Sequence, residues 1–131
     1  MRPALLTASA LIAALGLAAC GWGKEGLAVS EGDREYNGAV LFAQRCSGCH
    51  TLSAAGAQGT GNRSVRTQGP NLDGRTETYE DALFAIQNGG FSGAIMPQNI
   101  VVGEEAEAVA RFVAEYSGTE AEEAPRPGDS P

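Results

Sequence analysis

The sequence predicts a small all-α domain in which three main helices are joined by long loops. Three segments carry apolar residues at three- and four-residue intervals, which is the spacing of one helix face. No segment alternates apolar and polar residues for long enough to predict a strand. Of the 131 residues, 18 are glycine and 6 are proline, so the helices should be short. This length allows one domain.

The first residues have the composition of a secretory leader. Arg2 precedes an uncharged apolar run from Ala4 to Ala19, which is shorter than the roughly 20 residues of a membrane-spanning helix. The run ends in Leu-Ala-Ala-Cys-Gly, which resembles the lipobox of bacterial lipoproteins. By that resemblance, residues 1–19 are a signal peptide that is removed, and Cys20 becomes lipidated. An uncleaved apolar anchor is the alternative. Either way, we expect an exported domain anchored to the outer face of the cell membrane or on the periplasmic side.

Two polar segments flank the expected domain. Residues 20–32 contain four glycines after Cys20 and no helical pattern, which predicts a flexible linker. Residues 117–131 hold three prolines, four acidic residues and no large apolar residue, so we expect a disordered acidic tail. Residues 33–116 remain as the folded domain.

The first helix should run from Asp33 to about Cys46. Its apolar face carries Gly38, Leu41 and Phe42. The second helix, from Thr78 to Asn88, opens with a Thr-x-x-Asp variant of the capping box and ends at two glycines.

The third helix should run from Glu104 to Tyr116. It begins with acidic residues, which suit the positive end of a helix, and its apolar residues follow the i, i+3, i+4, i+7 spacing. Long loops at 51–77 and 89–103 connect the helices. So few aromatic residues give a thin core, which a buried prosthetic group would complete.

The segment Cys46-Ser-Gly-Cys49-His50 is the attachment signature of c-type haem. Two thiols three residues apart can each bond one vinyl group, and the adjacent histidine can reach the iron. The competing interpretations fit less well. A thioredoxin-like dithiol requires a βαβ context, zinc requires a fourth ligand, and a simple disulfide would leave His50 without a role.

The scarcity of metal-binding residues selects the second axial ligand. His50 is the single histidine, and Met96 is the single methionine once Met1 has left with the leader. Pro97 favours an extended Met96. The single lysine, Lys24, lies in the linker. We therefore expect the iron ligands to be His50 and Met96, with an open or water-bound sixth site as the alternative.

From about residue 34 to 116 the sequence resembles a class I monohaem cytochrome c. Gly38 and Phe42 match the family's first helix, and Phe112 and Tyr116 match the aromatic face that packs against it. The segment Gly69-Pro70-Asn71-Leu72 matches the family loop whose proline carbonyl accepts the Nδ1–H of the haem histidine. The resemblance therefore implies one covalent haem c with iron and assigns the Pro70 carbonyl to His50.

Some features depart from the family. The tryptophan that often binds a haem propionate has no counterpart, because Trp22 precedes the domain. Arg63, Arg66 or Arg75 could pair with the propionates, although simple solvent exposure is the favoured expectation for each. The core has no lysine, so partner recognition should rest on a small apolar patch.

These observations predict a membrane-tethered electron carrier of a respiratory chain and not an enzyme. A formal net charge of −7 argues against binding nucleic acid. The resemblance suggests a quinol-oxidising complex as electron donor and a terminal oxidase as acceptor. We expect a monomer that touches the bilayer through acylated Cys20. The alternatives are a fixed electron-entry subunit of one oxidase or dehydrogenase, and a haem sensor or peroxidase-like protein with an open sixth site.

Overall fold

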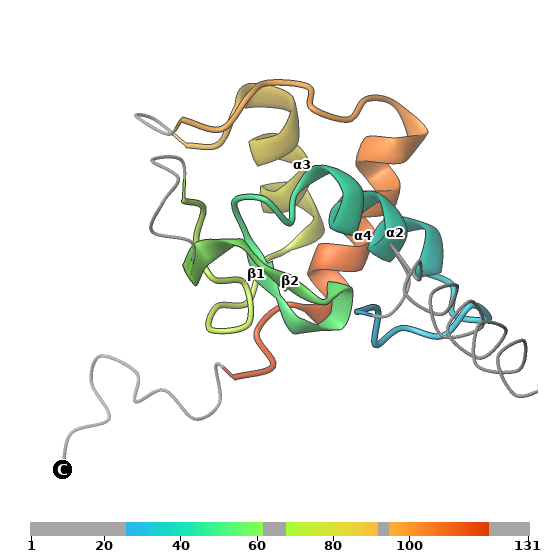
Figure 1. Cartoon of the computed structure of the whole chain (residues 1–131). Coiled ribbons are helices and arrows are strands. Elements are labelled where there is room, and N and C mark those ends of the chain that lie inside the picture. Colours follow the sequence, from blue (N-terminus) through green and yellow to red (C-terminus); the bar gives the residue numbers. More distant parts are fainter. Residues whose placement is uncertain (1–25, 62–67, 92–94, 121–131) are drawn as a thin grey trace, which may run out of the picture.

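The computed structural model describes residues 26–61, 68–91 and 95–120 of the chain. It contains three α-helices, α2 (Tyr36–Arg45), α3 (Tyr79–Asn88) and α4 (Glu104–Tyr116), joined by long loops (Figure 1). This arrangement confirms the predicted fold class. No helix among these residues has the length and apolar character needed to cross a bilayer.

The loop after α2 contains short regular elements that the sequence did not predict. Strands β1 (Thr51–Leu52) and β2 (Ala57–Gln58) pair antiparallel. The single-turn 3₁₀ helix η2 (Ser53–Ala55) lies between them, and a second one, η3 (Gly59–Gly61), follows β2. A strand of two residues is too short to show an alternating pattern. Further along, Gly69 N–H donates to Cys49 O at 2.7 Å and Leu72 N–H to Thr51 O at 2.9 Å. These bonds hold residues 69–72 beside the end of α2.

Helix α2 begins three residues later than predicted. Asp33 lies in the preceding turn, where its carboxylate accepts hydrogen bonds from the Glu35 N–H at 2.8 Å and from the Tyr116 hydroxyl at 2.6 Å. An aspartate that bonds the backbone two residues further on favours a turn over a helix. The side chain of Asp33 therefore delays the helix and also ties its start to the end of α4.

Helices α2 and α4 cross at Gly38. A Cβ atom on this residue would lie 2.7 Å from Phe112 Cβ, so the crossing distance requires glycine. The rings of Phe42 and Phe112 meet edge to face with centroids 5.7 Å apart, and Phe112 also contacts Tyr116. These contacts explain the spacing of the glycine and the aromatic residues in the sequence.

Helix α3 begins and ends at the capping residues that the sequence predicted. Thr78 Oγ1 accepts from the Asp81 N–H at 3.1 Å and so caps the helix, which begins at the next residue. The helix ends at Gly89, which adopts the left-handed conformation with φ 78°. Helix α4 has the predicted bounds.

The folded domain extends beyond both predicted boundaries. In the segment predicted to be a linker, Val29 is buried and the Ala28 N–H donates to Ala54 O at 3.0 Å. At the other end, Gly118 N–H donates to Leu72 O, and Glu120 N–H to Asp73 O, both at 2.8 Å. Residues 26–32 and 117–120 therefore belong to the domain. The predicted signal peptide, Cys20 and residues 121–131 lie outside the described residues.

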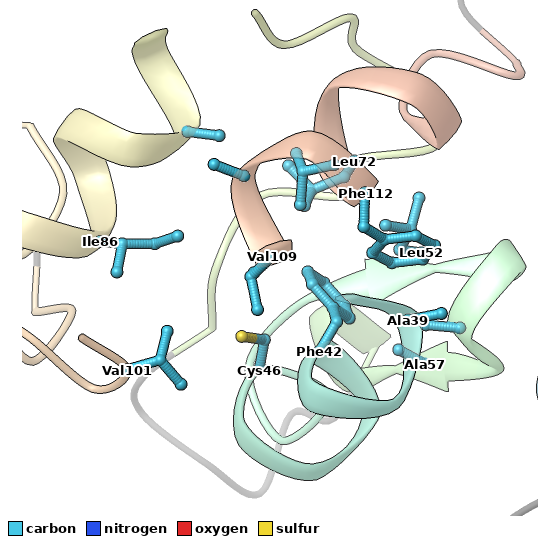
Figure 2. Packing of buried hydrophobic residues seen from close by; sticks show 14 of the residues in the cluster. Ala39, Phe42, Cys46, Leu52, Ala57, Leu72, Ile86, Val101, Val109 and Phe112 are labelled. Carbon is cyan, nitrogen blue, oxygen red and sulfur yellow. The ribbon is translucent and has the colours of Figure 1, made fainter. Parts of the chain in front are cut away.

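The core is small, as its composition suggested. The largest fully buried side chains are Phe42, Phe112, Leu52 and Val109, which pack where α2, α4 and β1 meet (Figure 2). Ile86 of α3 and Val101 are buried on the other side of Val109. Phe42, Ile86 and Val109 also line the cavity described next.

Candidate functional site

A cavity of about 700 Å³ brings together all five predicted haem-binding residues within the domain. The end of α2 and the residues after it contribute Cys46, Cys49 and His50 to its wall. Pro70 and Met96 come from the two long loops. Most of the other lining residues are apolar, among them Phe42, Ala82, Ala85, Ile86, Ile100, Val109 and Val113.

His50 is oriented by a hydrogen bond to the loop opposite. Its Nδ1 lies 3.1 Å from the carbonyl oxygen of Pro70. Because a carbonyl oxygen can only accept, this contact selects the tautomer with the proton on Nδ1, which leaves the lone pair of Nε2 for a metal. Burial lowers the pKa of His50 from its ordinary value, partly opposed by the bond to Pro70. The imidazole is thus neutral at pH 7, the form that binds iron.

Gly69 allows the Pro70 carbonyl to approach His50. A Cβ atom on Gly69 would lie 2.5 Å from Nδ1 of the ring and 2.7 Å from Nε2, so any larger residue would displace the imidazole or the loop. The Gly69 carbonyl accepts from Thr60 Oγ1 at 3.1 Å, and Thr60 Oγ1 accepts from the Thr51 N–H at 2.9 Å. Sequence reasoning missed these two roles. The glycine directly before Pro70 was the available signal, whereas nothing in the sequence singled out Thr60.

The two thiols lie on the turn that ends α2. The Cys46 N–H donates to Phe42 O at 2.8 Å, and the His50 N–H donates to Cys46 O at 2.9 Å, so the motif continues the helical winding. No disulfide joins Cys46 to Cys49. Burial, with a smaller contribution from Cys49, raises the pKa of Cys46 to about 12. Because only the thiolate form of cysteine binds a metal, this raised pKa argues against Cys46 as a metal ligand. Figure 2 shows the Cys46 sulfur directed away from Phe42.

The lining of the cavity also includes charged residues. Arg75 lines the cavity and forms an ion pair with Glu77, whose side chain is only 11% exposed. Asp81 of α3 also lines it. Of the three arginines considered for the propionates, Arg75 lies at the cavity, while Arg63 and Arg66 fall outside the described residues. Glu77 was not anticipated, because it lies in a loop with no motif around it.

These residues fit a covalently bound haem. A volume of about 700 Å³ lies within the range of about 300–1,000 Å³ that small-molecule and cofactor sites occupy. The cavity has an apolar wall, two thiols at its edge and a neutral imidazole. The Nδ1 of this imidazole is hydrogen-bonded to Pro70, so Nε2 is available to bind iron. The cavity also interrupts the small core. The domain is therefore built around a space that a flat apolar group would fill.

Comparison with known proteins gives the same picture. Residues 34–113 match the family model described as cytochrome C oxidase, cbb3-type, subunit III. The crystal structure of the c-type cytochrome SorU from Sinorhizobium meliloti is similar, with a TM-score of 0.52 and 36% sequence identity. That similarity covers 64% of this chain and 91% of SorU. None of the curated proteins matches the chain.

Proposed function

The chain belongs to the family of cytochrome C oxidase, cbb3-type, subunit III, whose members carry a c-type cytochrome domain, and we propose that it is a membrane-tethered one-electron carrier of a respiratory chain. The single observation that carries this proposal is the convergence of Cys46, Cys49, His50, Pro70 and Met96 on one cavity. A quinol-oxidising complex is the proposed donor and a terminal oxidase the proposed acceptor.

The bound haem would supply one-electron chemistry through its iron, and the chain's residues would hold it and set its ligands. Cys46 and Cys49 would form the two thioether bonds. His50 would bind iron through Nε2, and its Nδ1–H bond to Pro70 would fix the ring orientation and make the ligand more basic. The Met96 thioether would fill the sixth position, which raises the reduction potential and blocks substrate chemistry at the iron. A protein with this ligation is a carrier and not an enzyme.

An optical spectrum of the holoprotein tests this ligation. We expect the ferric protein to show the weak far-red band of methionine-bound iron, and Met96→Ala to lose it. A sensor or peroxidase-like protein with an open sixth site would instead show no such band in the unaltered protein. Retention of the band in Met96→Ala would show that another residue provides the ligand.

The proposed tether is a lipid on Cys20, which the end of the apolar leader supports. Attachment to the same membrane as its partners raises their effective concentration without any new contact. Mass spectrometry of protein purified from a membrane fraction should find a chain that begins at a diacylated Cys20. A free thiol at Cys20 together with an intact Met1 would reject the lipoprotein.

A second function is favoured by the family description, which names a subunit of an oxidase. In this alternative the chain is a fixed electron-entry subunit and not a mobile carrier. Purification in mild detergent distinguishes the two functions. A carrier should separate from its partners, whereas a fixed subunit should copurify with one oxidase or dehydrogenase at constant stoichiometry.

A further inference from the structure

The residues that follow Met96 are attached to the C-terminal end of α3. The Asn99 N–H donates to the carbonyl oxygen of Ile86 at 2.8 Å. The Gln98 side-chain amide donates to the carbonyl oxygen of Asn88 at 3.3 Å. Both acceptors lie in the last turn of α3, where the helix leaves carbonyl groups without a partner of its own. Figure 1 shows the segment leaving the side of α3 and crossing to the start of α4.

Gly89, at this helix end, lies directly against the Met96 backbone. A Cβ atom on Gly89 would lie 2.7 Å from the Met96 carbonyl oxygen and 2.9 Å from Gln98 Cγ. Contacts this short do not occur between real side chains, so only glycine permits the observed spacing. Its positive φ of 78° also favours glycine.

The backbone around Met96 is constrained on its own side as well. Pro97 has a fixed φ and restricts Met96 to extended conformations. Asn99 has a φ of 53°, the left-handed conformation that asparagine tolerates better than most residues. Met96 itself is only partly buried. Its position therefore depends on the attachment of the segment as well as on packing of its side chain against the core.

We infer that the C-terminal end of α3 positions Met96 toward the iron and that Gly89 is the residue on which this placement depends. The inference rests on the proposed ligation by His50 and Met96. Gly89 acts through the Met96 backbone and is thus a positioning residue. A side chain at this position would push the Met96 carbonyl away and lower the fraction of protein with the thioether on the iron.

The test compares Gly89→Ala with Gly118→Ala in the full-length holoprotein. Gly118 is a matched control because its φ is 76° and an added Cβ would lie 3.1 Å from Thr76 Cα, which does not line the cavity. Both variants should lose thermal stability, since alanine is strained at positive φ. Only Gly89→Ala should weaken the far-red ferric band and bind added imidazole about tenfold more tightly, because imidazole competes with Met96.

Two results would overturn the inference. One is an imidazole affinity of Gly89→Ala equal to that of the unaltered protein. The other is an equal change in Gly118→Ala at the same loss of stability. If Gly89→Ala yields no folded holoprotein, Gln98→Ala decides, because it removes the bond to Asn88 O without backbone strain. It should raise imidazole affinity about twofold, and no change would count against the inference.

Met96→Ala separates this inference from the proposed function. If Met96→Ala keeps the band and the imidazole affinity of the unaltered protein, the proposed ligation is wrong. If Met96→Ala loses the band while Gly89→Ala and Gln98→Ala behave like the unaltered protein, the ligation stands and only the positioning role is overturned.

Discussion

At the scale of single residues, the surroundings of His50 hold its imidazole in the form that can bind a metal. The Pro70 carbonyl holds the proton on Nδ1, and burial keeps the ring neutral. Neither effect is visible in the Cys-x-x-Cys-His motif itself. The bond to Pro70 depends on Gly69, whose missing side chain lets residues 69–70 reach the ring.

Replacing Gly69 by alanine should weaken the bond between His50 and Pro70. Because an added Cβ would lie 2.5 Å from Nδ1, the ring or the loop must move. A less basic histidine stabilises ferric iron less, so the reduction potential should rise by about 20–60 mV, roughly 0.5–1.4 kcal/mol for one electron. Redox titration measures this shift. Gly74→Ala is the control, since its nearest neighbour would be Asn71 O at 4.0 Å. An unchanged potential in Gly69→Ala would show that the bond does not tune the iron.

At the scale of elements, helices α2 and α4 approach each other so closely at Gly38 that there is no room for a side chain there. Replacing Gly38 by alanine should therefore change the stability in the direction opposite to the one that is usual within a helix. Replacing glycine by alanine inside a helix normally stabilises it by roughly 0.5–1 kcal/mol. At Gly38 the added Cβ would lie 2.7 Å from Phe112 Cβ, so we expect a loss of about 1–3 kcal/mol in the free energy of unfolding.

Denaturant unfolding of Gly38→Ala measures this loss. Gly32→Ala is the control, because an added Cβ there meets nothing within 4 Å. Stabilisation of the protein by Gly38→Ala would mean that the helices do not cross as closely as described.

The bond between Tyr116 of α4 and Asp33 before α2 should make stability depend on pH. The hydrogen bond to the Asp33 carboxylate raises the pKa of Tyr116 to about 12. An unfolded tyrosine titrates near pH 10. Since the folded pKa is the higher one, the bond stabilises the protein fully below about pH 10, and this contribution disappears as the pH rises through about 12. The same bond lowers the pKa of Asp33, so the contribution of Asp33 is present above its unfolded pKa and is lost in acid.

The free energy of unfolding of the unaltered protein and of Tyr116→Phe, measured from neutral pH to about pH 12, checks this effect. The difference between the two proteins should be constant up to about pH 10 and then shrink. A difference that does not change over this range would contradict the assignment of the bond.

At the scale of the whole molecule, the ends of the domain differ from those that composition suggested. Deleting residues 121–131 should leave both the haem spectrum and the melting temperature unchanged. Deleting residues 117–131 should lower the melting temperature, because it removes the bonds of Gly118 to Leu72 and of Glu120 to Asp73. Spectroscopy and thermal unfolding of the two truncated proteins test this. Equal melting temperatures would show that residues 117–120 contribute nothing.

The sequence predicted the features that depend on local patterns. The three helices and the cap of α3 all have signals within a few residues of each other, whereas the role of Gly38 followed from the resemblance to a family. The paths of residues 51–61 and 68–72 could not be predicted, because they are set by bonds between distant residues such as Gly69 and Cys49. The domain boundary was placed too late because one buried valine, Val29, lies in a glycine-rich segment without periodicity.

In the candidate site too, some residues could be predicted from the sequence and others could not. Cys46, Cys49, His50 and Met96 were identified by their chemistry and by the absence of competitors, and Pro70 by resemblance to a family. The residues that orient these groups were not identified, since Gly69, Thr60 and Gly89 act through spacing and backbone bonds. Such roles become visible only when the chain is folded.

The central claim, that this molecule carries electrons with both axial positions of its iron filled, is tested most directly by exposing the reduced, untreated holoprotein to carbon monoxide. If His50 and Met96 both stay on the iron, the optical spectrum should not change over the time of mixing. Rapid binding of carbon monoxide would show an open sixth position and would contradict the electron-carrier account.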